Sequence, residues 1–155
     1  MLVGASPSKA LQLEIQKLTY SEDVYLSSNI TDEYINAVYS GASVLLFPSI
    51  AEGFGWPIAE AMASGCPVIT TNEAPMTEVG GDAAFYIPQM PLENIDTAKW
   101  AVDAALVLQK VISANVEREI VIKKGLFNAL RFDTDKAMNE IENTIYEVLQ
   151  STHLQ

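Results

Sequence analysis

The stretch "PSIAEGFGWPIAEAMASGCPVIT", residues 48–70, decides how this chain of 155 residues is organised. It follows an apolar run at residues 44–47 and ends in a second run at residues 67–70. Continuous apolar runs of this kind are typical of strands that are covered on both faces in a parallel sheet. We therefore expect two buried parallel strands joined by a loop and a helix, with Glu52 and Glu60 in the connection.

Strand and helix patterns alternate along the chain up to about residue 88. Apolar runs predict strands, and apolar residues at helical spacing behind a Ser or Thr cap predict helices. Strands are expected at residues 2–5, 24–26, 44–47, 67–70 and 84–87, with helices after the caps Ser6 and Thr31, over residues 58–64 and from about residue 95 onward. This alternation predicts an α/β fold, a Rossmann-like doubly wound parallel sheet with flanking helices. We expect one domain over residues 1–155, with the βα units and the ligand site in 1–94 and C-terminal helices in 95–155.

The chain is strongly acidic, with a net charge of −11, and no lysine or arginine lies between Lys17 and Lys99. This charge disfavours nucleic acid and anionic membrane surfaces as partners. The longest apolar runs are too short for a transmembrane segment. The single cysteine, Cys66, excludes an internal disulfide and fits a reducing compartment. We therefore expect a cytoplasmic protein.

The loop before the helix has the composition of an anion site built from backbone groups. Ligands bind open parallel sheets in the crevice at the carboxyl ends of the strands, where this loop lies. Gly53 and Gly55 allow close approach of a ligand and can adopt φ > 0. The amides of this turn, including those of Phe54 and Trp56, point into the positive end of the helix that begins near Pro57. Such a turn can hold a phosphate without any cation.

The two glutamates have two interpretations. Glu60 lies one turn inside the helix, where its carboxylate can accept hydrogen bonds from two neighbouring hydroxyls, such as those of a ribose. Glu52 precedes the turn and would lie on the other side of the phosphates. Alternatively, both glutamates are present only because acidic side chains interact favourably with a helix N-terminus. The spacing alone leaves both interpretations open.

The residue identities in three segments resemble a known family. The pattern Glu-Gly-Phe-Gly-x-Pro-x-x-Glu-Ala-Met-Ala-x-Gly-x-Pro-Val-Ile at residues 52–69 is similar to that of the retaining GT-B glycosyltransferases of the "glycosyl transferases group 1" family. The segments "VYLSSNITDEYINAVYSGASVLLFPS" and "EVGGDAAFYIP" resemble the same family. The resemblance covers residues 2–88 well and the helical tail more loosely. It implies the nucleotide-sugar-binding C-terminal half of an enzyme that moves a sugar from a nucleotide-diphosphate sugar to an acceptor with retention, without a metal or other cofactor.

The resemblance also implies roles for individual residues. It places Glu52 beside the donor sugar as the catalytic group that stabilises charge at the anomeric carbon, and Glu60 on the ribose. The donor-binding residues that it implies are Gly53, Phe54, Gly55, Trp56 and Glu60, with Asn29 and Ile30 in the loop that reads the base. The family usually has a glycine where this chain has Ser28.

The resemblance further implies that the chain is an N-terminally truncated, partial domain. Family members carry an acceptor-binding N-terminal domain, and the first strand and helix of this domain, before the equivalent of Leu2. The absent part carries the cations that neutralise the diphosphate, so we expect weak donor binding and no transfer by this chain alone. In the full-length enzyme, the site would work in the cytoplasm at the inner membrane surface.

The absent strand would lie between residues 2–5 and residues 44–47. Buried strand edges without partners are costly, so the gap must be filled or closed. We expect residues 2–5 to pair directly with residues 44–47, in preference to a homodimer in which a second chain supplies the strand.

Two other functions remain as alternatives. One is a non-catalytic nucleotide-sugar-binding or assembly module, and the second is a sugar-nucleotide epimerase on a related fold. The sequence Asp133-Thr134-Asp135 imitates a metal-binding motif, but its place before an amphipathic helix predicts a helix cap, so no metal ligands are expected.

Overall fold

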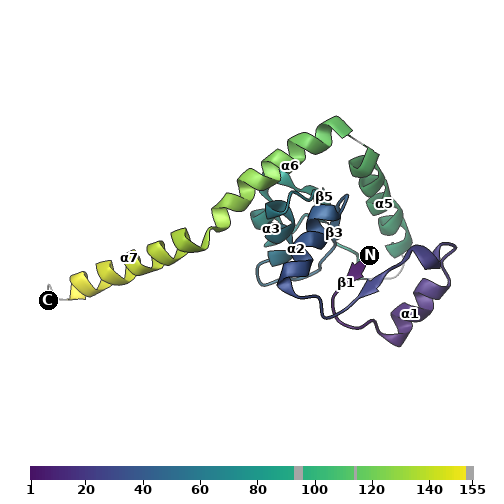
Figure 1. Ribbon diagram of the computed structural model, residues 1–155, viewed down its shortest axis with the longest axis horizontal. Coiled ribbons are helices and arrows are strands. Elements are labelled where there is room, and N and C mark those ends of the chain that lie inside the picture. Colours follow the sequence, from purple (N-terminus) through teal and green to yellow (C-terminus); the bar gives the residue numbers. More distant parts are fainter. Residues whose placement is uncertain (93–95, 114, 153–155) are drawn as a thin grey trace. The chain divides into compact units, whose positions relative to one another are not determined.

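The computed structural model describes residues 1–92, 96–113 and 115–152 and shows the alternation of strands and helices that the sequence predicts (Figure 1). The strands are β1 (Leu2–Val3), β2 (Leu26–Ser27), β3 (Leu45–Phe47), β4 (Val68–Thr71) and β5 (Phe85–Ile87). The α-helices are α1 (Lys9–Gln16), α2 (Asp32–Gly41), α3 (Trp56–Ala63), α4 (Met76–Gly80), α5 (Thr97–Ser113), α6 (Asn115–Ala129) and α7 (Thr134–Thr152). Short 3₁₀ helices lie between these elements: η1 (Ser21–Asp23), η2 (Gly81–Ala83) and η3 (Leu130–Phe132). The expected boundary between residues 94 and 95 lies outside the described residues.

The chain divides into two compact units, Met1–Val38 and Tyr39–Gln155. In the first unit, β1 and β2 pair in parallel, with Leu2 opposite Leu26. Helix α1 is capped by Ser8, whose hydroxyl accepts a hydrogen bond from the amide of Leu11 at 3.2 Å. The expected cap at Ser6 is therefore wrong, because Ser8 has the extended backbone of a cap.

The second unit contains a three-stranded parallel sheet in the order β3-β4-β5. All four residues of β4 are buried, so β4 is the central strand of this sheet. The expectation that residues 44–47 form a strand covered on both faces is wrong: Leu46 is 41% exposed, while Leu45 and Phe47 are half-buried. Among the described strands, β3 lies at an edge of this sheet and pairs with β4 alone.

The expected direct pairing of residues 2–5 with residues 44–47 is also wrong. Within the described ranges, β1 pairs with β2, and β3 pairs with β4. The expectation assumed that an unpaired edge of β3 would be buried, and therefore costly. Because β3 is partly exposed, its free backbone groups can form hydrogen bonds with water, and the penalty does not arise.

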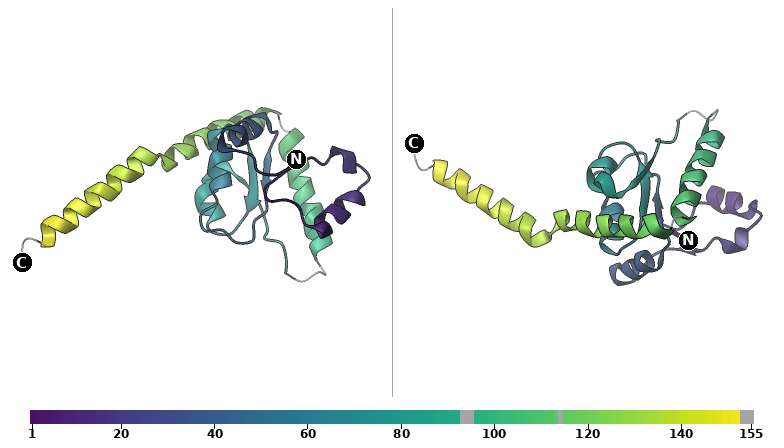
Figure 2. Two further views of the ribbon diagram at one scale, coloured as in Figure 1. Left: turned by 60° about the horizontal axis from the view of Figure 1, so that its bottom comes forward. Right: turned by 90° about the horizontal axis from the view of Figure 1, so that it is seen from above.

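Helices cover both faces of this sheet, as a doubly wound fold requires. Figure 2 shows α3 and α5 on opposite faces of the sheet. On the α5 face, Ile69 and Ile87 form the core with Ala104 and Val111. The α3 face is closed by buried side chains such as Met62 of α3.

Helix α6 packs closely on α3 because Gly125 of α6 leaves room for the side chain of Met62 on α3. A Cβ atom at Gly125 would lie 3.3 Å from the Cγ atom of Met62. Nearby, the buried Asn128 donates from Nδ2 to the carbonyl of Val79 at 2.7 Å. This hydrogen bond ties α6 to α4.

Helix α7 is exposed at every position whose side chain is described. The apolar residues expected on one face of this helix are between 53% and 56% exposed: Ile141, Ile145, Tyr146 and Leu149. In the part of the chain that the structure describes, no helix has the length and apolar character that crossing a membrane requires.

Candidate donor site

The loop that leaves β3 is held by side chains from neighbouring strands. The hydroxyl of Thr70 donates to the carbonyl of Phe47 at 2.9 Å, and that of Thr71 donates to the carbonyl of Ser49 at 2.9 Å. The amide nitrogen of the Gln89 side chain donates to the carbonyl of Ile50. Both threonines are fully buried, so their hydroxyls need these partners. The loop is thus positioned at the carboxyl end of β3, where parallel sheets bind ligands.

Glu52 lies exposed in this loop, with one carboxylate oxygen already engaged. The hydroxyl of Ser49 donates to Oε1 of Glu52 at 2.7 Å. A hydroxyl donor three residues away restrains the orientation of the carboxylate. Because a carboxylate can accept about four hydrogen bonds, Glu52 keeps acceptor capacity for a ligand.

The glycine turn leads directly into α3. Gly55 is the N-cap of α3, has φ +98°, and provides no side chain to bond the first amides. Gly53, in contrast, does not adopt the positive φ that we expected for it. A Cβ atom added at Gly53 would meet nothing within 4 Å, so the space beside its backbone is open. The turn therefore presents an uncapped helix N-terminus beside open space.

The two aromatic residues of the turn have different environments. Trp56 is 58% exposed, and its ring lies 4.6 Å from that of Phe54 between centroids, with the planes tilted by 42°. Phe54 also meets Phe132 of η3. The guanidinium of Arg131 lies 5.3 Å from the centre of the Phe132 ring. Phe54 is therefore part of a packed aromatic cluster, whereas much of the surface of Trp56 remains open.

Glu60 lies in the second turn of α3 and is exposed. The hydroxyl of Tyr39, in the last turn of α2, donates to Oε2 of Glu60 at 3.3 Å. Tyr39 is only 7% exposed. Its burial, and the charge and hydrogen-bond acceptance of Glu60, raise the pKa of Tyr39 to about 12.

Asn29 and Ile30 lie in the first unit, in the loop between β2 and α2. Asn29 has φ +58°, the left-handed conformation that asparagine tolerates better than most residues. The loop therefore makes its glycine-like turn at Asn29, one position after Ser28. Asn29 is exposed, and Ile30 is half-buried.

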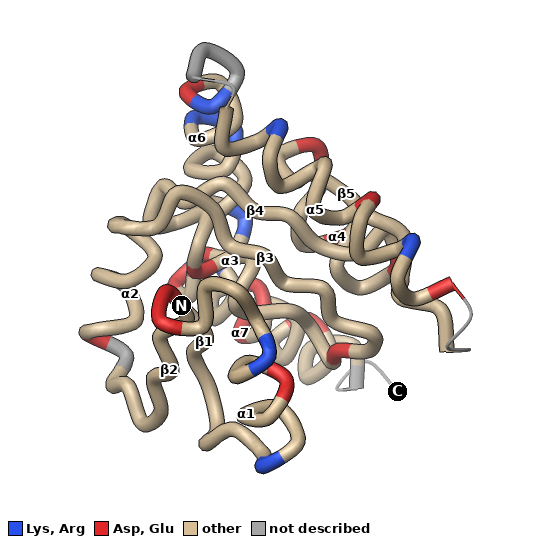
Figure 3. The backbone as a smooth tube through the Cα atoms, turned by 90° about the vertical axis from the view of Figure 1, so that its right-hand side faces the viewer, with Lys and Arg blue, Asp and Glu red and all other residues tan. Residues whose placement is uncertain are grey.

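The elements that carry the glycine turn lack cations, as the sequence predicts, although the guanidinium of Arg131 reaches the aromatic cluster beside the turn. None of the strands and none of the helices α2, α3 and α4 carries a lysine or arginine, as the tube in Figure 3 shows. Among the described residues, no group of three or more His, Cys, Asp and Glu side chains could hold a metal ion. Asp133 caps α7 by accepting a hydrogen bond from the amide of Lys136 at 2.8 Å, which confirms the expected cap. That the site works without a metal stays a prediction.

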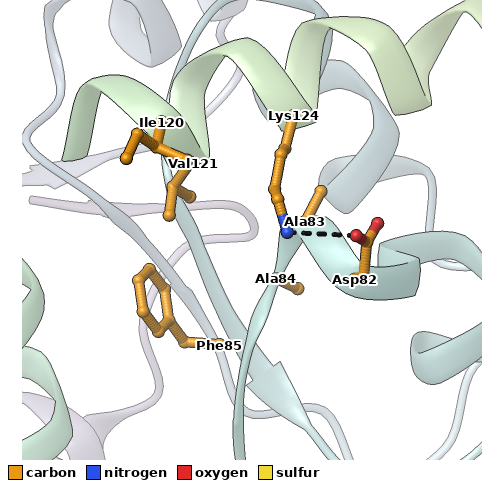
Figure 4. A pocket seen from close by; sticks show the side chains of 7 residues that line it. All are labelled: Asp82, Ala83, Ala84, Phe85, Ile120, Val121 and Lys124. Carbon is orange, nitrogen blue, oxygen red and sulfur yellow. Dashed lines mark hydrogen bonds and ion pairs between the residues drawn. The ribbon is translucent and has the colours of Figure 1, made fainter. Parts of the chain in front are cut away.

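A separate hollow of about 240 Å³ lies between η2, the start of β5 and α6 (Figure 4). Its floor is apolar, and Lys124 and Asp82 form an ion pair of 3.1 Å at its rim. The hydrogen bond from Lys124 lowers the pKa of the Asp82 carboxyl. None of the residues that line this hollow belongs to the expected donor site. We therefore regard the ion pair as a link between α6 and η2.

Three side chains of the site environment were not assigned to it from the sequence: Tyr39, Ser49 and Phe132. Tyr39 was expected on the apolar side of its helix. A tyrosine at a buried position is a signal, because its hydroxyl usually finds a polar partner. No comparable signal exists for Phe132, which reaches Phe54 only through the packing of α6 and η3.

Comparison with protein families gives a match to the family model "Glycosyl transferases group 1" over residues 1–124. O-antigen chain mannosyltransferase B of Escherichia coli is 32% identical over 120 residues, which are 77% of this chain and 29% of that protein. MMP alpha-(1->4)-mannosyltransferase of Mycolicibacterium hassiacum is 37% identical over 81 residues, which are 52% of this chain and 20% of that protein. The chain therefore spans less than a third of the length of these two relatives.

Two solved structures have the same fold. Sucrose-phosphate synthase from Thermosynechococcus elongatus has a TM-score of 0.74 at 21% identity, over 93% of this chain and 34% of that one. The pneumococcal O-GlcNAc transferase GtfA, solved in complex with UDP and GlcNAc, has a TM-score of 0.70 at 24% identity, over 91% of this chain and 28% of that one. These likenesses confirm the expected α/β fold.

Proposed function

Because the chain belongs to the glycosyl transferases group 1 family, we propose that it is the donor-binding part of a retaining glycosyltransferase and binds a nucleotide-diphosphate sugar. We propose sugar transfer as the general activity of the enzyme because the chain belongs to this family. The donor-binding role, retention of stereochemistry and the roles of single residues are the proposal. Family membership favours a transferase over the epimerase alternative.

One observation carries this proposal: two exposed glutamates lie on either side of an uncapped helix N-terminus. The α3 turn has no side-chain cap, and the space beside Gly53 is open. Helix N-termini of this kind bind phosphates through backbone amides and the helix dipole. We place the diphosphate here, with Trp56 beside it. That Asn29 and Ile30 read the base stays a prediction.

In this proposal the two glutamates contact different parts of the donor. Glu60, one turn inside α3, accepts hydrogen bonds from the ribose hydroxyls. Glu52, on the far side of the glycine turn, faces the sugar. When the bond to the diphosphate breaks, positive charge develops at the anomeric carbon, and a prepositioned carboxylate stabilises it. The hydrogen bond from Ser49 holds Glu52 ready for that role.

We further propose that the acceptor-binding residues, and more cations for the diphosphate, are supplied by the rest of the enzyme. The chain has no lysine or arginine between Lys17 and Lys99. We therefore propose that this chain alone binds its donor weakly, does not transfer sugar, and needs an acceptor-binding domain. The same charge pattern fits the alternative of a non-catalytic binding module. A transfer assay in the presence of that domain distinguishes the two, because only the transferase would move sugar. A cytoplasmic location stays a prediction.

Calorimetry on the purified chain tests the proposal. The ligands are the 5′-diphosphates of adenosine, guanosine, uridine and cytidine. We expect at least one to bind, and Glu60→Ala to weaken it by about 10- to 100-fold, because hydrogen bonds to a charged group are lost. Glu73→Ala, another exposed glutamate in the same unit, is the control and should leave the affinity unchanged. Absence of binding by the wild-type chain would contradict the proposal, and equal affinities would remove Glu60 from the site.

A further inference from the structure

A buried phenol on one helix contacts an exposed carboxylate on another. Tyr39 is 7% exposed, and its hydroxyl donates to Oε2 of Glu60 at 3.3 Å. We propose that Tyr39 is a positioning residue that orients the Glu60 carboxylate for recognition of the ribose diol. This inference rests on the proposed function, since it specifies how the same site distinguishes its ligand.

The arrangement divides the acceptor capacity of Glu60. A phenol has a single proton to donate, and that proton is directed at Oε2. Oε1 and the remaining lone pair of Oε2 stay available, which suits two hydroxyls on neighbouring carbons. Tyr39 itself therefore has no need to touch the nucleotide.

Holding the carboxylate matters because Glu60 is exposed. A free glutamate in water occupies several rotamers, and ordering it on binding costs free energy. The ring of Tyr39 is fixed by burial, so its hydroxyl offers a rigid anchor from α2 to a flexible side chain on α3. Binding then begins from a carboxylate that already has the required orientation.

The surroundings keep Tyr39 a donor. Burial, followed by the nearby charge of Glu60, raises the pKa of Tyr39 to about 12, and Cys66 adds to this effect. The phenol thus remains protonated over the whole physiological range. The hydrogen bond to Glu60 therefore does not switch with pH there.

Comparing ribonucleotides with deoxyribonucleotides tests the inference. Calorimetry would measure the affinity of the wild-type chain and of Tyr39→Phe for each of the four ribonucleoside 5′-diphosphates and its 2′-deoxy analogue. We expect Tyr39→Phe to lower the affinity for the ribonucleotide by about threefold to tenfold, the worth of one hydrogen bond. Affinity for the deoxy analogue should change by less than about twofold, because the full diol is absent.

Tyr86→Phe is the matched control. Tyr86 is half-buried and its pKa is likewise raised by burial, but its hydroxyl donates to the carbonyl of Gly81 at 2.6 Å. Its removal can lower stability and should leave the ratio of ribo to deoxy affinities unchanged. A double variant, Tyr39→Phe with Glu60→Ala, should bind no more weakly than Glu60→Ala alone, because each change removes one partner of the same hydrogen bond.

The outcomes separate the inference from the proposed function. A wild-type chain that prefers ribonucleotides, together with a Tyr39→Phe variant that prefers them equally, overturns the role of Tyr39 alone. Equal losses for ribo and deoxy ligands also overturn it, since they indicate a purely structural tyrosine. A wild-type chain that binds no nucleotide overturns the proposed function and this inference with it.

A spectroscopic titration covers the case in which Tyr39→Phe fails to fold. Glu60→Gln removes the negative charge beside Tyr39 and should lower the pH at which the last tyrosine ionises. An unchanged titration would show that the phenol and the carboxylate are not coupled, and would overturn the inference.

Discussion

The ring of Phe132 meets the ring of Phe54 edge-on, at 89° and with 5.4 Å between centroids. A residue that follows α6 thus supports the glycine turn that precedes α3. Edge-to-face pairs contribute about 0.5–1.5 kcal/mol beyond the area that they bury. The C-terminal helices are therefore part of the framework of the candidate site.

Replacing Phe132 should loosen this support. We expect Phe132→Leu to lower the free energy of unfolding by about 0.5–1.5 kcal/mol, because an apolar side chain remains but the aromatic edge is lost. Urea denaturation measures the change. Leu130→Ala is the control on the same 3₁₀ helix: Leu130 is 70% exposed, so its loss should matter little. Equal effects of the two variants would contradict the aromatic contribution.

The two glycines of the turn should respond differently to alanine. Gly55→Ala should destabilise the fold by about 1–2 kcal/mol, since a side chain is strained at φ +98°. Gly53→Ala should leave stability nearly unchanged, because its Cβ would meet nothing within 4 Å. If a nucleotide approaches that open space, Gly53→Ala should nevertheless weaken nucleotide binding. Thermal unfolding and calorimetry on both variants check this, and a Gly53→Ala variant with normal affinity would place the ligand elsewhere.

Replacing Glu52 should affect turnover more than binding. In a preparation that transfers sugar, with the acceptor-binding domain supplied, Glu52→Gln should lower kcat by about 100-fold or more and leave nucleotide affinity within about twofold. The reason is that its charge is needed only in the transition state. Ser49→Ala, which removes the hydroxyl at 2.7 Å, should have a smaller effect in the same direction. Normal turnover of Glu52→Gln would mean that this end of the motif is structural.

The raised pKa of Tyr39 predicts a loss of stability at high pH. The unfolded chain releases this proton near the ordinary value of about 10, whereas the folded chain keeps it until about 12. The unfolded state therefore binds fewer protons in this window, so the free energy of unfolding falls as the pH rises from 10 to 12. Tyr39→Phe should make that fall shallower in denaturation curves recorded across the window. If the free energy of unfolding falls equally steeply in the variant, the loss of stability is due to other groups, such as Tyr86.

The strands could be predicted from the sequence, but their places in the sheet could not. The apolar runs at residues 44–47 and 67–70 correspond to β3 and β4. Both runs look equally buried in the sequence, yet only β4 is central, because it pairs on both edges. Burial of this kind depends on which strands are neighbours, and a short apolar run does not encode its neighbours.

Local features of the candidate site were also more predictable than its contacts. The turn at Gly55 and the start of α3 follow from Gly55 and from Pro57, two positions later. The contact of Tyr39 with Glu60 depends on how α2 lies against α3, and that packing has no local signal. The left-handed backbone of Asn29, next to Ser28, was not predicted from the sequence either.

The buried hydroxyls of Thr70 and Thr71 have a consequence for the thermodynamics of binding. They anchor the carbonyls of Phe47 and Ser49 to the central strand, directly before Glu52. A loop that is already immobilised loses little conformational entropy when a ligand arrives. The substitutions Thr70→Val and Thr71→Val would then make association entropically less favourable, although neither one removes a group that faces the ligand.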